Sequence, residues 1–183
     1  MRERGAAHPY CCGVGELDAW THCPVCATPA RQEDGRFECP HCGYRTYAHS
    51  KPTASAIVAD DDGRILLSKR GSEPFAGKWD LPGGFLEEGE HPLDGAKREV
   101  REELGVGLAN ERLLGVWIDR YGDDDHAVTT LNVYYAARIG EGTPEPTDDV
   151  DELRWVAPDD VPKDELAFGH IEDVLSAWRD EYA

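Results

Sequence analysis

Four cysteines near the start of the chain constrain its fold more than any other feature. They form two C-x-x-C pairs, Cys23–Cys26 and Cys39–Cys42, separated by twelve residues. Two such pairs can place four thiolates around one Zn²⁺ with tetrahedral geometry, and Gly43 suits the tight turn after the second pair. The spacer ATPARQEDGRFE contains a glycine turn and little apolar material, so metal would supply the folding free energy of this segment. We predict a structural Zn²⁺ site, with a redox pair or disulfides as the alternatives.

The cysteine pattern resembles a zinc ribbon, which we expect over residues 21–50, after an N-terminal extension at 1–20. Four thiolates leave no open coordination position, so a catalytic zinc is not expected. Zinc ribbons often bind nucleic acid, but this one lacks a basic surface. Five further residues near the pairs are not assigned to the site, because solvated histidines are common and the two cysteines have no second pair: His8, Cys11, Cys12, His22 and His41.

The chain is strongly acidic, and the charge is uneven. Its net charge is -18, and residues 51–183 carry fourteen Lys or Arg against thirty-one Asp or Glu. Such a surface repels nucleic acid and anionic membranes, so an anionic substrate would need cations to mediate its binding. A high-salt cytoplasm and simple solubility both account for the acidity. With no apolar leader and no apolar stretch of about 20 residues, we expect a cytoplasmic protein.

The composition changes near residue 50, where we expect a second domain, 51–183, to begin. Runs at 53–59 and 64–70, with a DDDG turn signal between them, predict a hairpin. Further strands are expected at 113–118, 129–138 and 153–156, and helices at 92–104 and 169–180. The segments 119–127 and 140–151 are acidic and predicted to be loops. The sum indicates an α+β domain, an α/β/α sandwich with a mixed sheet.

Three glutamates share one side of the helix predicted at 92–104. On a helical wheel, Glu99 and Glu103 lie about 40° apart, and Glu102 lies about 60° from Glu99. Arg98 lies one turn from Glu102, where an i, i+4 ion pair can form. The carboxylates border the apolar stripe that will face the core, which consists of Leu93, Ala96, Val100 and Leu104.

These glutamates have two interpretations. Charged residues on a helix usually form a solvated surface. Here, however, desolvation beside the core makes unneutralised repulsion costly, and the preceding Pro82-Gly83-Gly84 turn lets backbone carbonyls approach a ligand closely. Three more acids, Glu87, Glu88 and Glu90, lie just upstream. We therefore predict hard oxygen ligands for Mg²⁺ or Mn²⁺.

Residues 84–106 resemble the Nudix box, G-x5-E-x7-R-E-U-x-E-E-x-G-U, where U is an aliphatic residue. Every specified position matches, from Gly84 and Glu90 to REVREELGV at 98–106. The approach to the box, Trp79-x-Leu81-Pro-Gly-Gly, also looks like that of the family. A zinc ribbon before the domain is similar to the arrangement in NADH pyrophosphatase-type Nudix proteins. The resemblance covers residues 21–180 and implies a Nudix-like mixed sheet.

The resemblance implies hydrolysis of a nucleoside diphosphate linked to a moiety X, with divalent metal bridging protein and pyrophosphate. It assigns the metal to Glu99 and Glu103, with the Gly83 carbonyl completing the site. Glu102 would assist the metal shell or hold Arg98, and Glu90 would orient Arg98. The catalytic base varies in this family; a box glutamate and an acid in the segment DDVDE at 148–152 both remain candidates.

The identity of X is less well defined. Residues 113–127, LLGVWIDRYGDDDHA, lack the SQPWPFP-type stretch of NADH pyrophosphatases, and Tyr121 and Gly122 stand where ADP-ribose hydrolases carry a proline. Tyr121, Trp117 or Phe85 are candidates to stack on a base, with a core role favoured for Trp117. Arg70, and also Lys69, are candidates for phosphate contact. Arg70 and Tyr121 are the substrate-binding residues we predict.

Three functions compete at this stage. The leading one is a Mg²⁺-dependent pyrophosphohydrolase acting on ADP-ribose or an NAD(H)-like dinucleotide. The second is a house-cleaning nucleoside triphosphate pyrophosphatase, and the third is a non-catalytic Nudix-like nucleotide sensor. A pure sensor has no need of the complete set of box glutamates. The expected partner is a small nucleotide, with no membrane, nucleic acid unfavoured, and a homodimer left open.

Overall fold

The computed structural model describes residues 16–123 and 127–182. These residues divide into two compact units, one of residues 16–50 with 123 and 127–128, the other of residues 51–122 with 129–182. His8, Cys11, Cys12 and most of the extension expected at 1–20 lie outside the described residues. Each unit is described below by itself.

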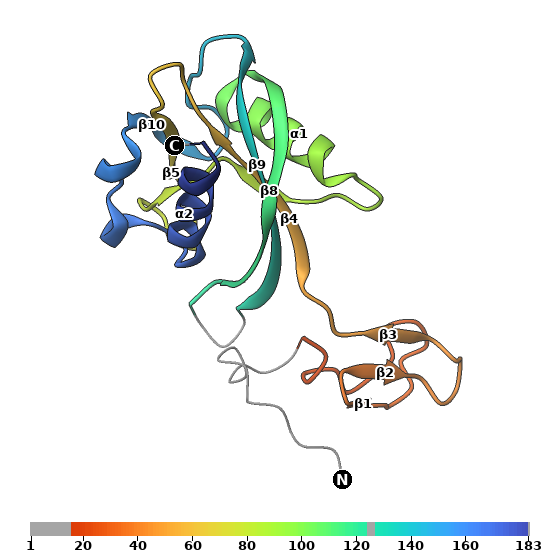
Figure 1. The fold of residues 1–183 in the computed structure, drawn as a ribbon. Helices are drawn as coiled ribbons and strands as arrows, with labels where there is room; N and C mark the ends of the chain where they lie inside the picture. Colours follow the sequence, from red (N-terminus) through yellow and green to blue (C-terminus); the bar gives the residue numbers. More distant parts are fainter. Residues whose placement is uncertain (1–15, 124–126, 183) are drawn as a thin grey trace. The chain divides into compact units, whose positions relative to one another are not determined.

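The first unit contains a small three-stranded sheet (Figure 1). Its strands follow the order β1-β2-β3, and they are β1 (Gln32–Glu33), β2 (Arg36–Glu38) and β3 (Arg45–Tyr47). Phe37 is fully buried and packs edge-on against Trp20, with ring centroids 5.4 Å apart. Gly35 (φ 74°) lies in the turn that joins β1 to β2, a conformation that glycine adopts without strain.

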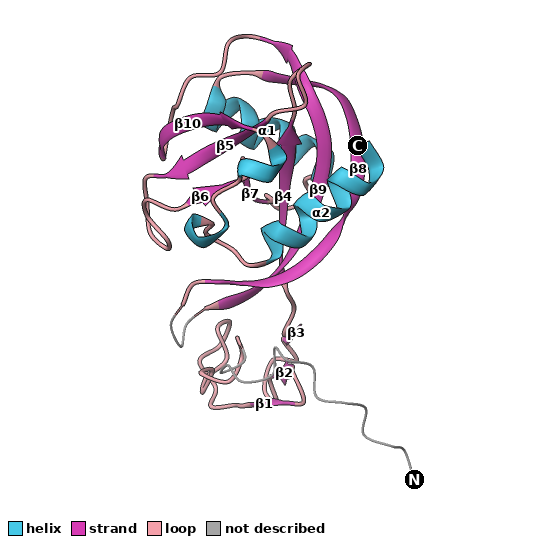
Figure 2. Cartoon of the chain, turned by 60° about the vertical axis from the view of Figure 1, so that its left-hand side comes forward, coloured by secondary structure: helices cyan, strands magenta, loops and turns pink. Residues whose placement is uncertain are grey.

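The second unit contains two sheets and two α-helices (Figure 2). One sheet has the order β7-β4-β9-β8 and the other β10-β5-β6. The strands are β4 (Lys51–Val58), β5 (Ile65–Arg70), β6 (Trp79–Asp80), β7 (Gly83–Phe85), β8 (Gly107–Tyr121), β9 (Val128–Glu141) and β10 (Val150–Val156). The helices are α1 (Pro92–Leu104) and α2 (His170–Tyr182), with short 3₁₀ turns η1 (Pro158–Asp160) and η2 (Lys163–Glu165).

The two helices cover opposite faces of the sheets. Since successive side chains of a strand point to opposite faces, neighbouring residues belong to different cores. On β4, Ile57 packs with Ile171 of α2, whereas Ala56 and Val58 pack with Val100 of α1. The same alternation runs along β9, with Tyr134 and Ala136 on the α2 side and Val133 and Tyr135 on the α1 side. The α/β/α sandwich with a mixed sheet is thus confirmed.

Helix α1 has the bounds that its sequence predicts. Pro92 occupies the first turn, and the His91 side chain accepts a hydrogen bond from the Leu93 amide at 3.2 Å. Gly105 ends the helix with a left-handed conformation (φ 68°), and its N–H donates to the Arg101 carbonyl at 3.0 Å. Both ends are determined locally, which is why the sequence predicts them well. Helix α2 begins and ends within two residues of its expected bounds.

The predicted hairpin at 53–70 is wrong beyond its turn. The DDDG turn forms, with the Asp60 N–H donating to the Arg64 carbonyl at 2.9 Å, but only the bridge Ala59–Ile65 joins the two strands. Strand β4 instead pairs in parallel with β9, from Lys51–Thr130 to Val58–Ala137, while β5 pairs with β10 and β6. Because most of β4 is buried, it is covered on both faces and needs partners that lie far away in the chain.

The acidic segments expected to be loops are partly strands. Strand β8 runs on to Tyr121, β9 to Glu141, and β10 already begins at Val150, so each extends beyond its predicted bounds. The sequence does not reveal these extensions, because polar residues occupy the exposed strand positions. In β8, an edge strand, most residues are half-buried or exposed. Among the described residues, no helix has the length and apolar character needed to cross a lipid bilayer.

Candidate functional site

Helix α1 places two carboxylates against the glycine pair at the start of β7. The carboxylates are those of Glu99 and Glu103, and the glycines are Gly83 and Gly84. The Gly83 N–H donates to Glu103 Oε2 at 3.1 Å. A Cβ on Gly84 would lie 2.6 Å from the Glu99 carboxylate, so only glycine lets that side chain rest on the strand. On Gly83, which has φ 150°, a Cβ would lie 2.2 Å from Ser55 Oγ. The glycines of the box are therefore required by the close approach of its own glutamates and of β4.

Arg98 uses four of its five N–H groups to bind three glutamates. Nε and Nη2 bind the two oxygens of Glu90, each at 2.9 Å, and Nη1 binds Glu99 at 2.7 Å and Glu102 at 3.0 Å. The last N–H donates to the Phe85 carbonyl at 3.1 Å. Hydrogen bonds from Arg98 lower the pKa of Glu90 to about 2. The guanidinium is saturated, so it orients carboxylates and has no donor left for a ligand.

Two of the glutamates line a cavity of about 290 Å³, and Glu102 does not. Glu99 and Glu103 share the acidic part of its wall with Asp80, Asp148 and Asp149. Glu102 is half exposed and paired with Arg98. From the predicted segment 148–152, only the first two residues line this cavity; Glu152 pairs with Lys69 at 3.4 Å. Lys69, a candidate for phosphate contact, is therefore turned to a carboxylate outside the wall.

The acidic wall is electrostatically strained without a cation. Burial, followed by the charges of Asp80 and Glu99, raises the pKa of Glu103 well above its ordinary value. Burial also raises the pKa of Glu99 and of Asp80, although Arg98 and Arg70 respectively oppose these shifts. Carboxylates that resist ionisation in this way form a donor set suited to a hard divalent cation, which removes their mutual repulsion.

An aromatic wall lies beside the acidic one. Tyr121 stacks on Phe168 with centroids 5.8 Å apart and meets Phe85 edge-on at 5.0 Å. Arg70 lies 5.6 Å from the centroids of Tyr121 and Phe168, donates to the Tyr121 hydroxyl at 3.1 Å and pairs with Asp80 at 3.1 Å. The structure thus brings together the two predicted substrate-binding residues, Arg70 and Tyr121. Trp117 packs on Tyr134 against the core, as its sequence context predicts.

A third wall consists of polar side chains other than carboxylates, from β4, β9 and the start of α2. They are buried and hydrogen-bonded to one another, and they comprise Thr53, Ser55, Thr130, Asn132, Tyr134 and His170. His170 Nδ1 lies 2.6 Å from the Asp119 carboxylate and its Nε2 lies 2.8 Å from the Tyr134 hydroxyl. Although partial burial opposes ionisation, hydrogen bonds from His170 and the Arg120 amide lower the pKa of Asp119.

The sequence analysis did not predict this third wall, nor did it predict Phe168 in the aromatic wall. Phe168 and His170 precede or begin a helix that looks like an ordinary amphipathic element. Thr53, Asn132 and Tyr134 lie in strands whose pattern indicates only burial. Their meeting depends on the parallel pairing of β4 with β9, for which the local sequence carries no signal.

A larger cavity of about 530 Å³ lies elsewhere in the same unit. It is lined by the turn after β4, the start of β8, the end of β9 and Trp178 of α2. None of the predicted catalytic or metal-binding residues lines it. We place the candidate active site in the smaller cavity, because that is where the box carboxylates converge.

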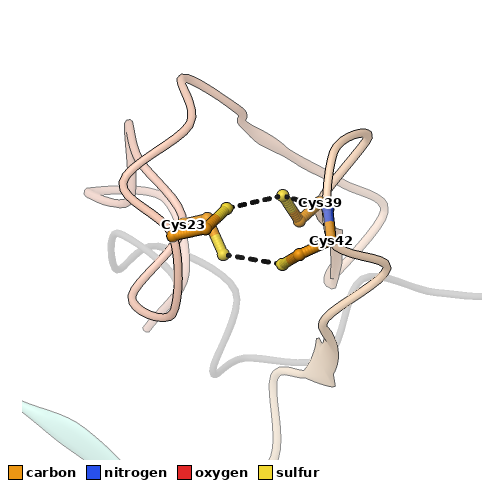
Figure 3. A group of neighbouring side chains, drawn as sticks. Cys23, Cys39 and Cys42 are labelled. Atoms are coloured by element: carbon orange, nitrogen blue, oxygen red, sulfur yellow. Dashed lines mark hydrogen bonds between the residues drawn. The ribbon is translucent and has the colours of Figure 1, made fainter.

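The four cysteines of the first unit lie close enough together to hold a metal ion. Their sulfur atoms all lie within 4.8 Å of one another, with Cys23–Cys42 at 3.7 Å and Cys26–Cys39 at 3.6 Å (Figure 3). A tetrahedral Zn²⁺ with bonds of about 2.3 Å holds its sulfurs roughly 3.8 Å apart, so the spacing fits this ion. In the described part of the chain it is the only group of three or more Cys, His, Asp or Glu ligand atoms gathered so closely.

The turns around the cysteines support the same interpretation. The Val25 and Cys42 amides donate to the sulfurs of Cys23 and Cys39 at 3.4 and 3.5 Å. Gly43 adopts φ 74°, as the sequence predicts for the second turn. Hydrogen bonding with Thr28 lowers the pKa of the Cys26 thiol to about 5. Although the Tyr44 amide opposes it, burial and hydrogen bonds with the other three cysteines raise the pKa of Cys42 to about 12. His22 and His41 are exposed and outside the cluster.

The chain is similar to several hydrolases. A protein named ADP-ribose pyrophosphatase, from Methanocaldococcus jannaschii, is 34% identical over 136 residues, 74% of this chain and 78% of that protein. A protein named NAD-capped RNA hydrolase NudC, from Pseudomonas aeruginosa, is 29% identical over 142 residues, 76% of this chain but only 49% of that protein. A crystal structure of a NUDIX hydrolase from Nitrosomonas europaea superposes with a TM-score of 0.69 at 25% identity, covering 89% of this chain and 92% of that one.

The model of the NUDIX domain matches residues 49–175. This match covers well over half of the chain and includes the acidic, aromatic and polar walls described above. The chain therefore belongs to the Nudix family of hydrolases.

Proposed function

We propose that the protein is a Mg²⁺-dependent pyrophosphohydrolase that cleaves a nucleoside diphosphate linked to a moiety X, such as ADP-ribose or an NAD(H)-like dinucleotide. The observation that carries the proposal is the five-carboxylate wall of the cavity. The one Arg or Lys that lines this cavity, Arg70, is already paired with Asp80. A pyrophosphate enters such a wall only with divalent cations between the two. The similarity to a protein named ADP-ribose pyrophosphatase supports this substrate class.

In this proposal Glu99 and Glu103 hold the cation, with the Gly83 carbonyl beside them. When bound, Mg²⁺ neutralises charge on the pyrophosphate and lowers the pKa of a coordinated water. Glu102 belongs to the support of the site, because it is half exposed and bonded to Arg98. Glu90 has the same task, since it occupies two of the guanidinium donors.

The hydrolysis forms one bond from water oxygen to phosphorus and breaks one phosphoanhydride bond, with the leaving phosphate taking the electron pair. The proton of the attacking water passes to a carboxylate of the acidic wall. Asp149 and the box glutamates are the candidates within reach of the cavity. Ser72 donates to Asp149 Oδ2 at 2.9 Å and fixes its direction, and the Gly71 amide anchors its carbonyl at 2.6 Å.

We also propose that the four-cysteine cluster binds one structural Zn²⁺. The spacing of the four sulfurs supports it. The cluster lacks an open position, so its role is to hold residues 16–50 in their fold rather than to take part in the hydrolysis.

A pair of variants tests the assignment of the active site. Glu103→Gln removes a charge from the cavity wall and should lower kcat by at least about a hundredfold with saturating Mg²⁺. Glu102→Gln, one residue earlier and outside the wall, should lower it by less than about tenfold. The assay follows the products of ADP-ribose, NADH and ATP by mass. If Glu103→Gln hydrolyses its substrate as fast as the parent, the metal assignment is wrong.

A further inference from the structure

The larger cavity of the second unit is a separate site, although it shares strand β9 with the active site. Strand β9 lines the active-site cavity up to Tyr134 and the larger cavity with residues 136–138. On α2, His170 lines the first cavity and Trp178 the second, and eight residues of helix span about 12 Å. None of the described residues lines both cavities. The larger cavity can therefore hold a ligand of its own.

This cavity exists because small side chains follow large ones on the side of the sheet that faces α2. Ala59 lies two residues after Ile57, and Ala136 lies two residues after Tyr134, all in contact with the same core cluster. Trp178 lines the cavity from the helix. We call Ala59, Ala136 and Trp178 the apolar floor. The volume of about 530 Å³ is in the range of small-molecule sites.

The two carboxylates that line this cavity already have partners. Asp60 Oδ2 accepts a hydrogen bond from Arg64 Nε at 2.8 Å, and its Oδ1 accepts from the backbone amides of Asp62 and Arg64. Glu111 pairs with Lys97 of α1 at 2.7 Å, and hydrogen bonding with Lys97 lowers the pKa of Glu111. Because the partner cations lie outside the lining, these carboxylates do not occupy the arginines that line the cavity.

Two arginines of the lining, on the neighbouring strands β8 and β9, have donors to spare. Arg112 of β8 makes no hydrogen bond, ion pair or ring contact with any residue of 16–123 or 127–182. Arg138 of β9 directs Nη1 to the Asp61 carboxylate at 2.7 Å, and the Asp61 side chain is fully exposed. An exposed ion pair of this kind contributes little to stability, so Arg138 can exchange Asp61 for a ligand.

Strand alternation turns both arginines toward α2. Arg138 shares the face of β9 with Ala136, and Arg112 shares the face of β8 with Leu114, which packs against the same core cluster. Trp178 belongs to that cluster too. Both arginines are exposed, so their donors lie at the rim of the cavity. In a domain that is acidic overall, this cavity combines free guanidinium donors with an apolar floor.

We propose that this cavity binds a small organic anion, whose aromatic body lies on the apolar floor and whose phosphate or carboxylate group pairs with Arg112 and Arg138. A guanidinium binds two oxygens of either group at once, more strongly than neutral groups bind each other. The apolar floor favours an organic molecule over a free inorganic ion, because it gains from burial. The site needs no Mg²⁺, and the proposal does not depend on the proposed hydrolysis.

An NMR titration of the whole protein without added Mg²⁺ tests the proposal. The reporter is the indole N–H of Trp178, whose signal the Trp178→Phe variant assigns. AMP and benzoate each join an aromatic body to an oxyanion, whereas adenosine lacks the anion and inorganic phosphate lacks the body. AMP, benzoate or both should shift the signal with a Kd below about 1 mM. Adenosine and inorganic phosphate should bind at least about tenfold more weakly. The tighter of AMP and benzoate identifies the anionic group.

Matched variants assign the binding to the cavity. Arg112→Gln removes the charge of an exposed side chain and should weaken binding by about tenfold or more. Arg101→Gln makes the same change at an exposed arginine outside the lining and should leave the Kd within about twofold of the parent. Ala59→Leu fills the cavity from its floor and should abolish the shift. Thermal melting verifies that each variant is folded.

Three results would overturn the proposal. One is a Trp178 signal that neither AMP nor benzoate shifts at up to about 10 mM. Another is an affinity for adenosine or inorganic phosphate equal to that of the tighter organic anion. The third is an equal effect of Arg112→Gln and Arg101→Gln. Since the titration needs no turnover, its failure leaves the proposed hydrolase intact, and an inactive hydrolase leaves this site intact.

Discussion

The two units of this chain differ in how much apolar surface they bury. In the first unit, the buried apolar cluster consists of Leu17, Phe37 and two of the cysteines. The second unit has three such clusters, and the largest joins α2 to both sheets. We expect the short segment, which has so little apolar surface, to depend on metal for its fold, whereas the larger unit gains enough free energy from burial. The comparison teaches that one chain can combine a metal-dependent and a core-dependent unit, which should respond to different perturbations.

Removal of zinc should produce the largest difference between the units. With a chelator, or in the Cys39→Ser variant, amide exchange should become unprotected throughout β1, β2 and β3, because metal binding supplies the folding free energy of that segment. Protection in the core of residues 51–182 should remain. His41→Ala is the control, since His41 is exposed and outside the cluster. Persistent protection of the Phe37 amide in metal-free protein would contradict the prediction, as would purified protein with less than about half an equivalent of zinc.

Truncating a buried side chain in the core of the second unit should destabilise that unit and leave the first unit unchanged. Ile171 is fully buried on α2, and Ile171→Ala should lower the free energy of unfolding of the second unit by about 2–5 kcal/mol through lost burial and a cavity. The zinc content should not change. Val25→Ala, at an exposed site of the first unit, should cost less than about 0.5 kcal/mol. Denaturant unfolding measures both, and a loss of zinc in Ile171→Ala would show that the units do not fold separately.

The acidic wall should have a smaller effect, on the pH dependence of the stability of the second unit. The first unit has no such wall. The folded-state pKa of Glu103 is raised, so the folded protein holds a proton there more tightly than the unfolded chain does. Its contribution to stability is fully present below the ordinary pKa of 4.5 and is lost as pH rises through the folded pKa. In metal-free protein, Glu103→Gln should therefore reduce, by about a few degrees, the fall of melting temperature that the parent shows as pH rises above 4.5.

Mg²⁺ provides the complementary measurement for Glu103. At the alkaline end it should raise the melting temperature of the parent, because it replaces the missing proton, and raise that of Glu103→Gln less. Glu102→Gln, whose carboxylate is half exposed, should follow the parent. Equal pH slopes in the parent and Glu103→Gln would refute the electrostatic account of the wall.

Raising the salt concentration should give the smallest difference in stability between the two units. Residues 51–183 carry a net charge of -17 and residues 1–50 a net charge of -1. Raising the ionic strength from about 0.1 M to about 1 M shortens the Debye length from roughly 10 Å to roughly 3 Å. The melting temperature of the second unit should rise by a few degrees, while zinc retention by the first should stay constant. Equal responses of the two units would show that net charge does not account for the salt effect.

Features that depend on neighbouring residues could be predicted from the sequence. Pro92 and Gly105 set the ends of α1, and the two C-x-x-C pairs set the cysteine turns, because caps and knuckles involve residues a few positions apart. The box glutamates were predicted by the same kind of spacing, and two of them do share the cavity. Their chemical roles stay predictions until the variants above are measured.

The rest of the fold depends on distant pairing. The parallel register that sets Thr53 beside Asn132 joins segments about eighty residues apart, and nothing local distinguishes it from a hairpin. The same pairing creates the polar wall, so an error in one strand partner hides a whole side of the cavity. Phe168 and His170 were missed because the helix that they precede or begin looks like an ordinary amphipathic element.

The contact between His170 and Asp119 also has a consequence for the order in which the protein becomes competent during synthesis. The ribosome makes the amino-terminal segments first, so the box helix at 92–104 and the cysteine cluster are complete long before residue 170 emerges. Until α2 docks, Tyr134 lacks its hydrogen-bond partner His170, and the cavity lacks one of its sides. Under the proposed function, the carboxylates that would hold the cation are therefore synthesised early, whereas the cavity that would hold the nucleotide is complete only with the last helix.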